Sequence, residues 1–146
     1  MLIYLDMCCL KRPFDDQSQA RIRLESEAVL GLLALESKGV RFVRSAALAL
    51  ENSLNPVKER STKVGLWLAA EPETPFDARI LRARTTELIA LGLKNFDAIH
   101  IAAAEQAKAV VFASCDDRLL KAAARIGDQI SVRVASVVDL AREILT

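Results

Sequence analysis

The sequence predicts an α/β protein of three layers, in which helices cover both faces of a mostly parallel sheet of about four to five strands. Short, almost continuously apolar segments alternate with longer segments whose apolar residues recur at helical spacing. Strands of this composition are typical of parallel sheets that are buried on both faces. No internal repeat or linker interrupts the 146 residues, so we expect a single domain over residues 1–146.

The chain begins with a predicted strand and a predicted helix. Leu2 to Leu5 is an apolar run with the length of a short buried strand. Asp16 and Gln19 have the spacing of a capping box, so we expect a helix to start there. Gly39 stands where this helix needs a C-terminal cap.

Residues 40–70 predict a second strand and two helices. The segment "VRFVRS" is strand-like, and Ser45 at its end can cap a helix over residues 46–54. Pro56 stops that helix and fits the first turn of another one, which runs to about Ala70. The loop "EPETPF" follows.

The second half of the chain predicts four helices and two strands. The strands again lie between helices, as parallel pairing requires. In chain order we expect a helix that contains Ile80, Leu81, Leu88 and Leu91 and ends at Gly92, a helix over 96–109 capped by Asn95, a strand over 110–114, a helix over 117–127, a strand over 130–136 and a helix over 138–145.

Composition restricts the classes of function. The net charge is only +1, which argues against a protein that coats nucleic acid through bulk charge. No stretch approaches the roughly 18 apolar residues of a membrane span, and the apolar start lacks a basic signal region, so we expect a cytoplasmic protein without a membrane partner. The three cysteines include the adjacent pair Cys8 and Cys9 and fit no zinc spacing. We interpret this pair as free thiols that pack as small apolar side chains.

Four acidic residues are candidates for a shared site. In open α/β sheets, sites form beyond the carboxyl ends of the strands. Asp6 follows the first strand, and Asp116 follows the strand over 110–114; if these strands are neighbours, about 4.8 Å apart, their carboxylates can share an ion. Glu51 and Asp97 stand in apolar surroundings, and we expect Asp97 to face inward from its helix. Burying such charges requires a compensating partner.

A divalent cation is the partner that suits these residues. Four converging carboxylates would repel one another and raise some of their pKa values unless cations neutralised them. Mg²⁺ or Mn²⁺ prefers oxygen ligands and commonly bridges carboxylates to a phosphate. Two such ions, about 3.5–4 Å apart, could activate water and stabilise the leaving oxygen of a phosphodiester.

Each acid also has a simpler interpretation. Asp97 could be a first-turn acid favoured by the helix dipole, and Asp116 could cap the helix that follows it. Glu51 could be a helix residue that emerges into water. Asp6 is different, because we predict no helix beside it to cap.

Three neighbours of these acids receive secondary roles. Asp117 fits the start of a helix better than a metal site, and Ser114 offers a hydroxyl near Asp116. His100 is the only histidine, and we favour a hydrogen-bonding role in the core over metal ligation or general-base catalysis.

In this order, the motifs resemble those of the PIN-domain ribonucleases, and in particular the toxin of bacterial VapBC-type toxin–antitoxin pairs. Such proteins carry an Asp after the first strand, a Glu on an early helix, an Asp-Ala pair before an apolar helix with a His, and a Ser or Thr two residues before a last Asp. The corresponding residues here are Asp6 in "YLDMCC", Glu51 in "LALENS", Asp97 in "FDAIHIAAAE", and Ser114 and Asp116 in "SCD".

The resemblance implies an Mg²⁺- or Mn²⁺-dependent endoribonuclease with these four acids as catalytic metal ligands. It also implies RNA as substrate, cleaved to a 5′-phosphate and a 3′-hydroxyl, a small antitoxin protein as inhibitor, and a homodimer. Lys11 and Arg12, beside the first acid, could position phosphate groups.

Two other functions are alternatives to this one. Met7 and Cys8 stand where the family usually offers Ser or Thr, so the alternative is a catalytically weakened or inactive PIN-fold binding module. A phosphotransfer enzyme or receiver domain would also place an Asp at a strand end. A dehalogenase-type site needs a second Asp where Cys8 stands, and the acid pair and late lysine of a receiver are not visible.

Overall fold

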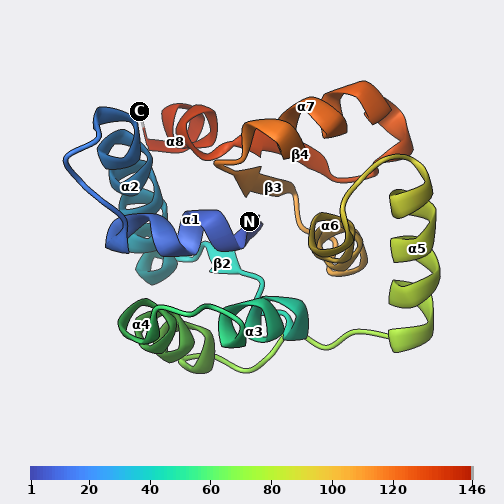
Figure 1. Cartoon of the computed structure of the whole chain (residues 1–146), viewed down its shortest axis with the longest axis horizontal. Helices are drawn as coiled ribbons and strands as arrows, with labels where there is room; N and C mark the ends of the chain where they lie inside the picture. The colour runs from blue at the N-terminus through green and yellow to red at the C-terminus, as the bar shows by residue number, and fades with distance from the viewer. Residues whose placement is uncertain (146) are drawn as a thin grey trace.

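The computed structural model describes residues 1–145 and has the predicted three-layer α/β architecture (Figure 1). Its four strands form one sheet in which every neighbouring pair is parallel. In spatial order the strands are β2 (Arg41–Phe42), β1 (Leu2–Leu5), β3 (Val111–Ser114) and β4 (Arg133–Ser136). The all-parallel sheet confirms the predicted fold class.

Eight α-helices connect and cover the strands. α2 and α8 pack against each other on one side of the sheet, whereas α6 lies on the other side with α3 and α5 packed against it (Figure 1). α7 packs against β4. α4 packs against α3. The bounds are α1 Met7–Lys11, α2 Ala20–Leu33, α3 Ala46–Ser53, α4 Lys58–Ala69, α5 Ala78–Ala90, α6 Asn95–Gln106, α7 Asp117–Ile126 and α8 Val137–Leu145.

The register of β1 and β3 fixes the carboxyl edge of the sheet. Leu5 pairs with Ala113, and the backbone N–H of Asp6 donates to the carbonyl oxygen of Ala113 at 2.9 Å. Asp6 and Ser114 therefore leave the sheet side by side, as expected for neighbouring parallel strands.

The core lies between the sheet and both helical layers. Tyr4 and Phe112, from the two central strands, are fully buried, and their ring centroids are 5.2 Å apart. Ile101 of α6 and Leu140 of α8 are also fully or almost fully buried. This packing fixes the central strands, and with them the residues at their carboxyl ends.

Several local predictions are confirmed. Ser45 caps α3, because its Oγ accepts a hydrogen bond from the backbone N–H of Leu48 at 3.1 Å. Gly39 ends the helical segment after α2 with φ of 93°, a left-handed conformation that glycine adopts without strain. The segment "VRFVRS" is in the sheet only over Arg41–Phe42, because the chain leaves the sheet before Ser45 to enter α3.

Other local predictions are wrong. α2 begins at Ala20 rather than at the predicted capping box, and Asp16 instead accepts a hydrogen bond from the N–H of Ser18 in a local turn. Asn95 is the first residue of α6 rather than its cap. α1 was not predicted, because five residues are too few to display helical periodicity.

Among the helices of residues 1–145, none combines the length and the apolar composition that crossing a membrane requires.

Candidate metal centre at the carboxyl edge of the sheet

Asp6 lies at the centre of the candidate site and is only 5% exposed. Its Oδ1 accepts a hydrogen bond from the backbone N–H of Met7 at 2.8 Å, so Asp6 caps α1. The expectation that Asp6 has no helix to cap is therefore wrong. The cap uses one carboxylate oxygen and does not supply a countercharge. Burial raises the pKa of Asp6 well above its ordinary value, and the neighbouring Cys8 and Asp97 raise it further.

The second oxygen of Asp6 contacts a hydroxyl and a thiol. Ser114 Oγ donates to Asp6 Oδ2 at 2.8 Å, and Cys8 Sγ donates to the same oxygen at 3.4 Å. The Oγ of Ser114 also accepts from the backbone N–H of Asp116 at 3.0 Å. Ser114 thus connects the residue after β1 to Asp116, the residue just before α7.

Glu51 reaches Asp6 from α3 and is oriented by His100 of α6. The Nε2 of His100 lies 2.6 Å from Oε1 of Glu51, and because a carboxylate only accepts, Nε2 carries the proton. One ligand atom from each of Asp6, Glu51 and His100 can be chosen so that all three lie within 4.8 Å of one another. The structure therefore brings two of the four predicted acids into direct proximity.

A chain of buried hydrogen bonds holds His100 in place. In the neutral imidazole, Nδ1 accepts from the hydroxyl of Tyr4 at 2.6 Å. The Tyr4 oxygen lies 2.7 Å from the hydroxyl of Ser45, which caps α3. Burial raises the pKa of Tyr4 well above its ordinary value, so the phenol stays protonated. His100 itself is fully buried, which agrees with the hydrogen-bonding role favoured from the sequence.

Asp97 stands in the first turn of α6 and is half-buried. Burial and the carboxylate of Asp116 raise its pKa to about 6, with a further contribution from Glu51, while His100 lowers it. Asp97 lies outside the closest group of ligand atoms. Its pKa nevertheless responds to two of the other acids, and it in turn raises the pKa of Asp6.

Asp116 caps α7, as its simpler interpretation proposed. Its Oδ1 accepts from the backbone N–H groups of Arg118 and Leu119, at 2.9 and 3.4 Å. Within residues 1–145, no protein donor reaches its Oδ2, which is therefore available to a ligand. A capping role and a metal-binding role are compatible at this residue, because they use different oxygens.

The four acids differ in their charged neighbours from other shielded acids of the chain. Glu25 forms ion pairs with Arg12 and Arg21, and Glu105 pairs with Arg84. Within residues 1–145, by contrast, no lysine or arginine forms an ion pair with Asp6, Glu51, Asp97 or Asp116. A divalent cation would supply the missing charge, and these oxygen donors suit Mg²⁺ or Mn²⁺.

The remaining candidate residues have varied surroundings. Asp117 is exposed and forms two hydrogen bonds to Arg21, at 2.8 and 2.9 Å, which lower its pKa. Arg12 is held by Asp15 and Glu25, so a phosphate would have to compete with two carboxylates for it. Lys11 ends α1 and forms no ion pair among the described residues. A phosphate-positioning role for Lys11 and Arg12 stays a prediction.

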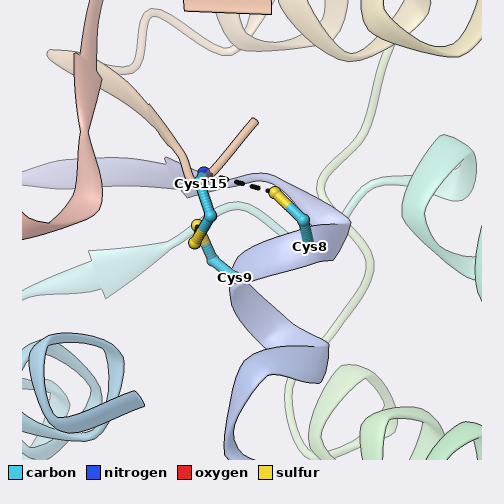
Figure 2. A group of neighbouring side chains, drawn as sticks. All are labelled: Cys8, Cys9 and Cys115. Carbon is cyan, nitrogen blue, oxygen red and sulfur yellow. Dashed lines mark hydrogen bonds between the residues drawn. The ribbon is translucent and has the colours of Figure 1, made fainter. Parts of the chain in front are cut away.

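Sequence reasoning missed that Cys115 joins Cys8 and Cys9. Their three sulfur atoms lie within 4.8 Å of one another (Figure 2). The cluster adjoins the acidic site of Asp6, Glu51, Asp97 and Asp116, because Cys8 Sγ is 3.4 Å from Asp6 Oδ2. Hydrogen bonds from Cys8 and Cys9 lower the pKa of Cys115 to about 4, and burial raises that of Cys9. The sequence does contain a sign of this cluster, because the cysteines follow β1 and β3, the two strands whose terminal acids were expected to lie close together.

Comparison of the chain with protein-family models, curated proteins and solved structures found no match. The assignment of a function therefore depends on the residues and geometry described above.

Proposed function

We propose that this chain is an Mg²⁺- or Mn²⁺-dependent endoribonuclease of the PIN-domain type. One observation carries the proposal: Asp6 and Glu51 meet at the carboxyl edge of a parallel sheet, the charges of Asp97 and Asp116 act on the same group of acids, and no lysine or arginine among residues 1–145 pairs with any of the four. Their identities and order along the chain are those of the motifs that resemble the PIN-domain family.

Asp6, Glu51, Asp97 and Asp116 would hold the cation. His100 orients Glu51 by a hydrogen bond to Oε1, so Oε2 of Glu51 is left for a ligand. Carboxylates that bind metals are commonly held by such hydrogen bonds. Ser114 and the N–H of Met7 fix both oxygens of Asp6, so its carboxylate is positioned before any ion binds.

The bound ion would lower the pKa of a coordinated water and stabilise the leaving oxygen of a phosphodiester. The contribution of the chain itself is to orient the carboxylates and to limit the access of bulk water to Asp6. Burial of Asp6 strengthens its interaction with a cation, because the surroundings screen charge poorly.

The resemblance also leads us to propose partners and a compartment. We propose RNA as substrate, a small antitoxin protein as inhibitor, a second copy of the chain as partner, and the cytoplasm as location. Apolar surface suited to protein contacts is present on and after α3 and on α4, where Leu50, Leu54 and Leu66 are 55%, 64% and 68% exposed.

The second candidate function is a PIN-fold binding module with little or no catalysis. The observation in its favour is Cys8, whose thiol lies 3.4 Å from Asp6 where the family usually offers a hydroxyl. A thiol is a poor ligand for Mg²⁺ and a weak hydrogen-bond donor. Ser114 still provides one hydroxyl to the same oxygen.

The deciding experiment compares Asp116→Asn with Asp117→Asn. Asparagine caps a helix nearly as well as aspartate, so Asp116→Asn should preserve α7 while it removes one carboxylate. Asp117 is the adjacent acid and points to Arg21, which makes its asparagine variant a matched control. Purified proteins would be incubated with mixed cellular RNA in Mn²⁺ or Mg²⁺.

The proposal predicts metal-dependent cleavage by the wild type and by Asp117→Asn, with a loss of roughly 100-fold or more in Asp116→Asn. Asp6→Asn should lose activity to a similar degree. Equal cleavage by all variants would contradict the nuclease assignment. Cleavage by none of them in either metal would instead favour the binding module.

A further inference from the structure

We propose that Cys8, Cys9 and Cys115 form a site for a thiophilic metal ion such as Zn²⁺ or Cu⁺, adjacent to the acidic site but chemically distinct from it. The inference goes beyond the proposed nuclease function and does not depend on it. The three residues form the thiol cluster, which contains every cysteine of the chain.

The thiol cluster has the spacing that a single ion requires. Three thiolates bound to one ion at about 2.3 Å have sulfur atoms about 3.8–4.0 Å apart. The Sγ atoms of Cys9 and Cys115 are 3.5 Å apart, and all three sulfur atoms lie within 4.8 Å of one another. Side-chain movements of no more than about an ångström would bring the three sulfur atoms to this separation.

The backbone topology explains why the cluster exists. Cys8 and Cys9 stand in the first turn of α1, just after β1, and Cys115 follows β3 (Figure 2). Because β1 and β3 are neighbouring strands, the two segments leave the sheet together. Rigid elements therefore hold all three side chains, as a preorganised metal site needs.

Polar groups around the cluster suit negatively charged sulfur. The backbone N–H of Cys115 donates to Cys8 Sγ at 3.3 Å, a type of contact that stabilises thiolate ligands (Figure 2). The thiol of Cys9 donates to the carbonyl oxygen of Ala113 at 3.4 Å, and bonding to an ion would replace this weak contact.

The ligand set selects a different ion from the one proposed for the acids. Thiolates favour soft or borderline ions, whereas Mg²⁺ and Mn²⁺ favour oxygen. Cys8 lies between the two sets, because its Sγ is 3.4 Å from both Asp6 Oδ2 and Ser114 Oγ. It is also the only partly exposed member of the cluster, so ions would enter from its side.

The test is a titration of the reduced, full-length protein with Cd²⁺ in excess Mg²⁺. Cadmium is the probe because bonds to thiolate give a strong charge-transfer absorption in the ultraviolet. We expect one Cd²⁺ per chain, with an absorption increment that corresponds to three thiolates. Zn²⁺ should displace Cd²⁺ or compete with it, and Mg²⁺ should not.

Variants assign the ligands. Cys115→Ser and Cys8→Ala should each weaken Cd²⁺ binding by roughly ten-fold or more and lower the absorption increment by about one thiolate. Glu143→Gln, which removes an exposed carboxylate that pairs with Arg133, should bind Cd²⁺ as the wild type does. Circular dichroism would establish that each variant is folded.

A measurement on the wild type alone keeps the proposal testable if a cysteine variant does not fold. Stoichiometric Zn²⁺ should protect Cys8 from alkylation by iodoacetamide. No charge-transfer absorption with one equivalent of Cd²⁺, an increment of only one or two thiolates, or unchanged alkylation of Cys8 in Zn²⁺ would each overturn the proposal. Equal Cd²⁺ binding by Cys115→Ser would overturn it as well.

Discussion

The Nε2 atom of His100 donates a hydrogen bond to Oε1 of Glu51 across 2.6 Å, which joins α6 to α3 beneath the acidic site. The contact pairs a fully buried ring with a carboxylate that is 28% exposed. His100 thus positions Glu51, one of the proposed metal ligands, without itself having to contact the ion. The stability of the site therefore depends on the hydrogen bonds behind His100.

Removing the Tyr4 hydroxyl tests the buried hydrogen bonds that link Ser45, Tyr4 and His100. Tyr4→Phe deletes the group between His100 Nδ1 and Ser45, and it leaves a buried nitrogen without its donor. We expect the free energy of unfolding to fall by about 1–2 kcal/mol, measured by urea denaturation. Glu51→Gln, which keeps an acceptor for Nε2, should cost less. If the Tyr4→Phe protein were as stable as the wild type, the buried hydrogen bonds of Tyr4 would not stabilise the fold.

The raised pKa of Asp97 predicts how stability changes with pH. The pKa is about 6 in the native state, above the ordinary value of about 3.9 in an unfolded chain. Between these values the native state binds more protons, so stability contributed by Asp97 is complete below pH 4 and is lost as the pH rises through about 6.

Asp97→Asn should reverse this loss. In metal-free buffer at pH 7 we expect it to be more stable than the wild type by about 1 kcal/mol, after allowance for solvent screening of a half-exposed group, and equally stable at pH 4. The pKa of Asp117 is lowered, so its charged form stabilises the native state at neutral pH. Asp117→Asn should therefore lose stability at that pH. Urea titrations across pH 4–8 would measure both, and parallel curves for wild type and Asp97→Asn would refute the prediction.

Divalent cations should stabilise the wild type in a pH-dependent manner. At 100 times its dissociation constant, Mn²⁺ adds about 2.7 kcal/mol to the free energy of unfolding. The effect should shrink near pH 5, because protons compete for Asp6 and Asp97, whose pKa values are raised. Thermal unfolding with Mn²⁺ and with chelator would measure it. Stabilisation that persists in Asp6→Asn would place the ion elsewhere.

Cys8→Ser tests the substitution that favours the inactive alternative. A serine hydroxyl at this position could donate to Asp6 more strongly than the thiol, which now lies 3.4 Å away, and it is also a better ligand for a hard cation. We expect the dissociation constant for Mn²⁺ to fall roughly three- to ten-fold, by calorimetric titration, with RNA cleavage rising in parallel. Cys8→Ala is the matched control. If serine and alanine behave alike, the hydroxyl has no role.

The sheet and its acidic edge could be predicted because their signals are local. Apolar runs such as Leu2–Leu5 define buried strands, and an acid directly after each run marks the carboxyl edge. Helix caps such as Ser45 are also visible in the sequence. The side chains of Asp6 and Asp116 could therefore be placed on one edge before their contacts were known.

The contacts behind the site could not be predicted, because they depend on how α6 packs against β1. Tyr4 and His100 are 96 residues apart, and each alone is an ordinary core residue. The capping role of Asp6 was missed because α1 has only five residues. The proximity of Cys115 to Cys8 and Cys9 could not be predicted from spacing, because it arises from the pairing of β1 with β3 and not from closeness along the chain.

The most direct test of the account is a crystal structure of the protein grown with Mn²⁺ and recorded at a wavelength where manganese scatters anomalously. We expect one or two anomalous peaks about 2–2.3 Å from carboxylate oxygens of Asp6, Glu51, Asp97 or Asp116, and none in the Asp6→Asn protein. Ordered carboxylates without an anomalous peak, or a peak bound only at exposed acids such as Asp117, would contradict it.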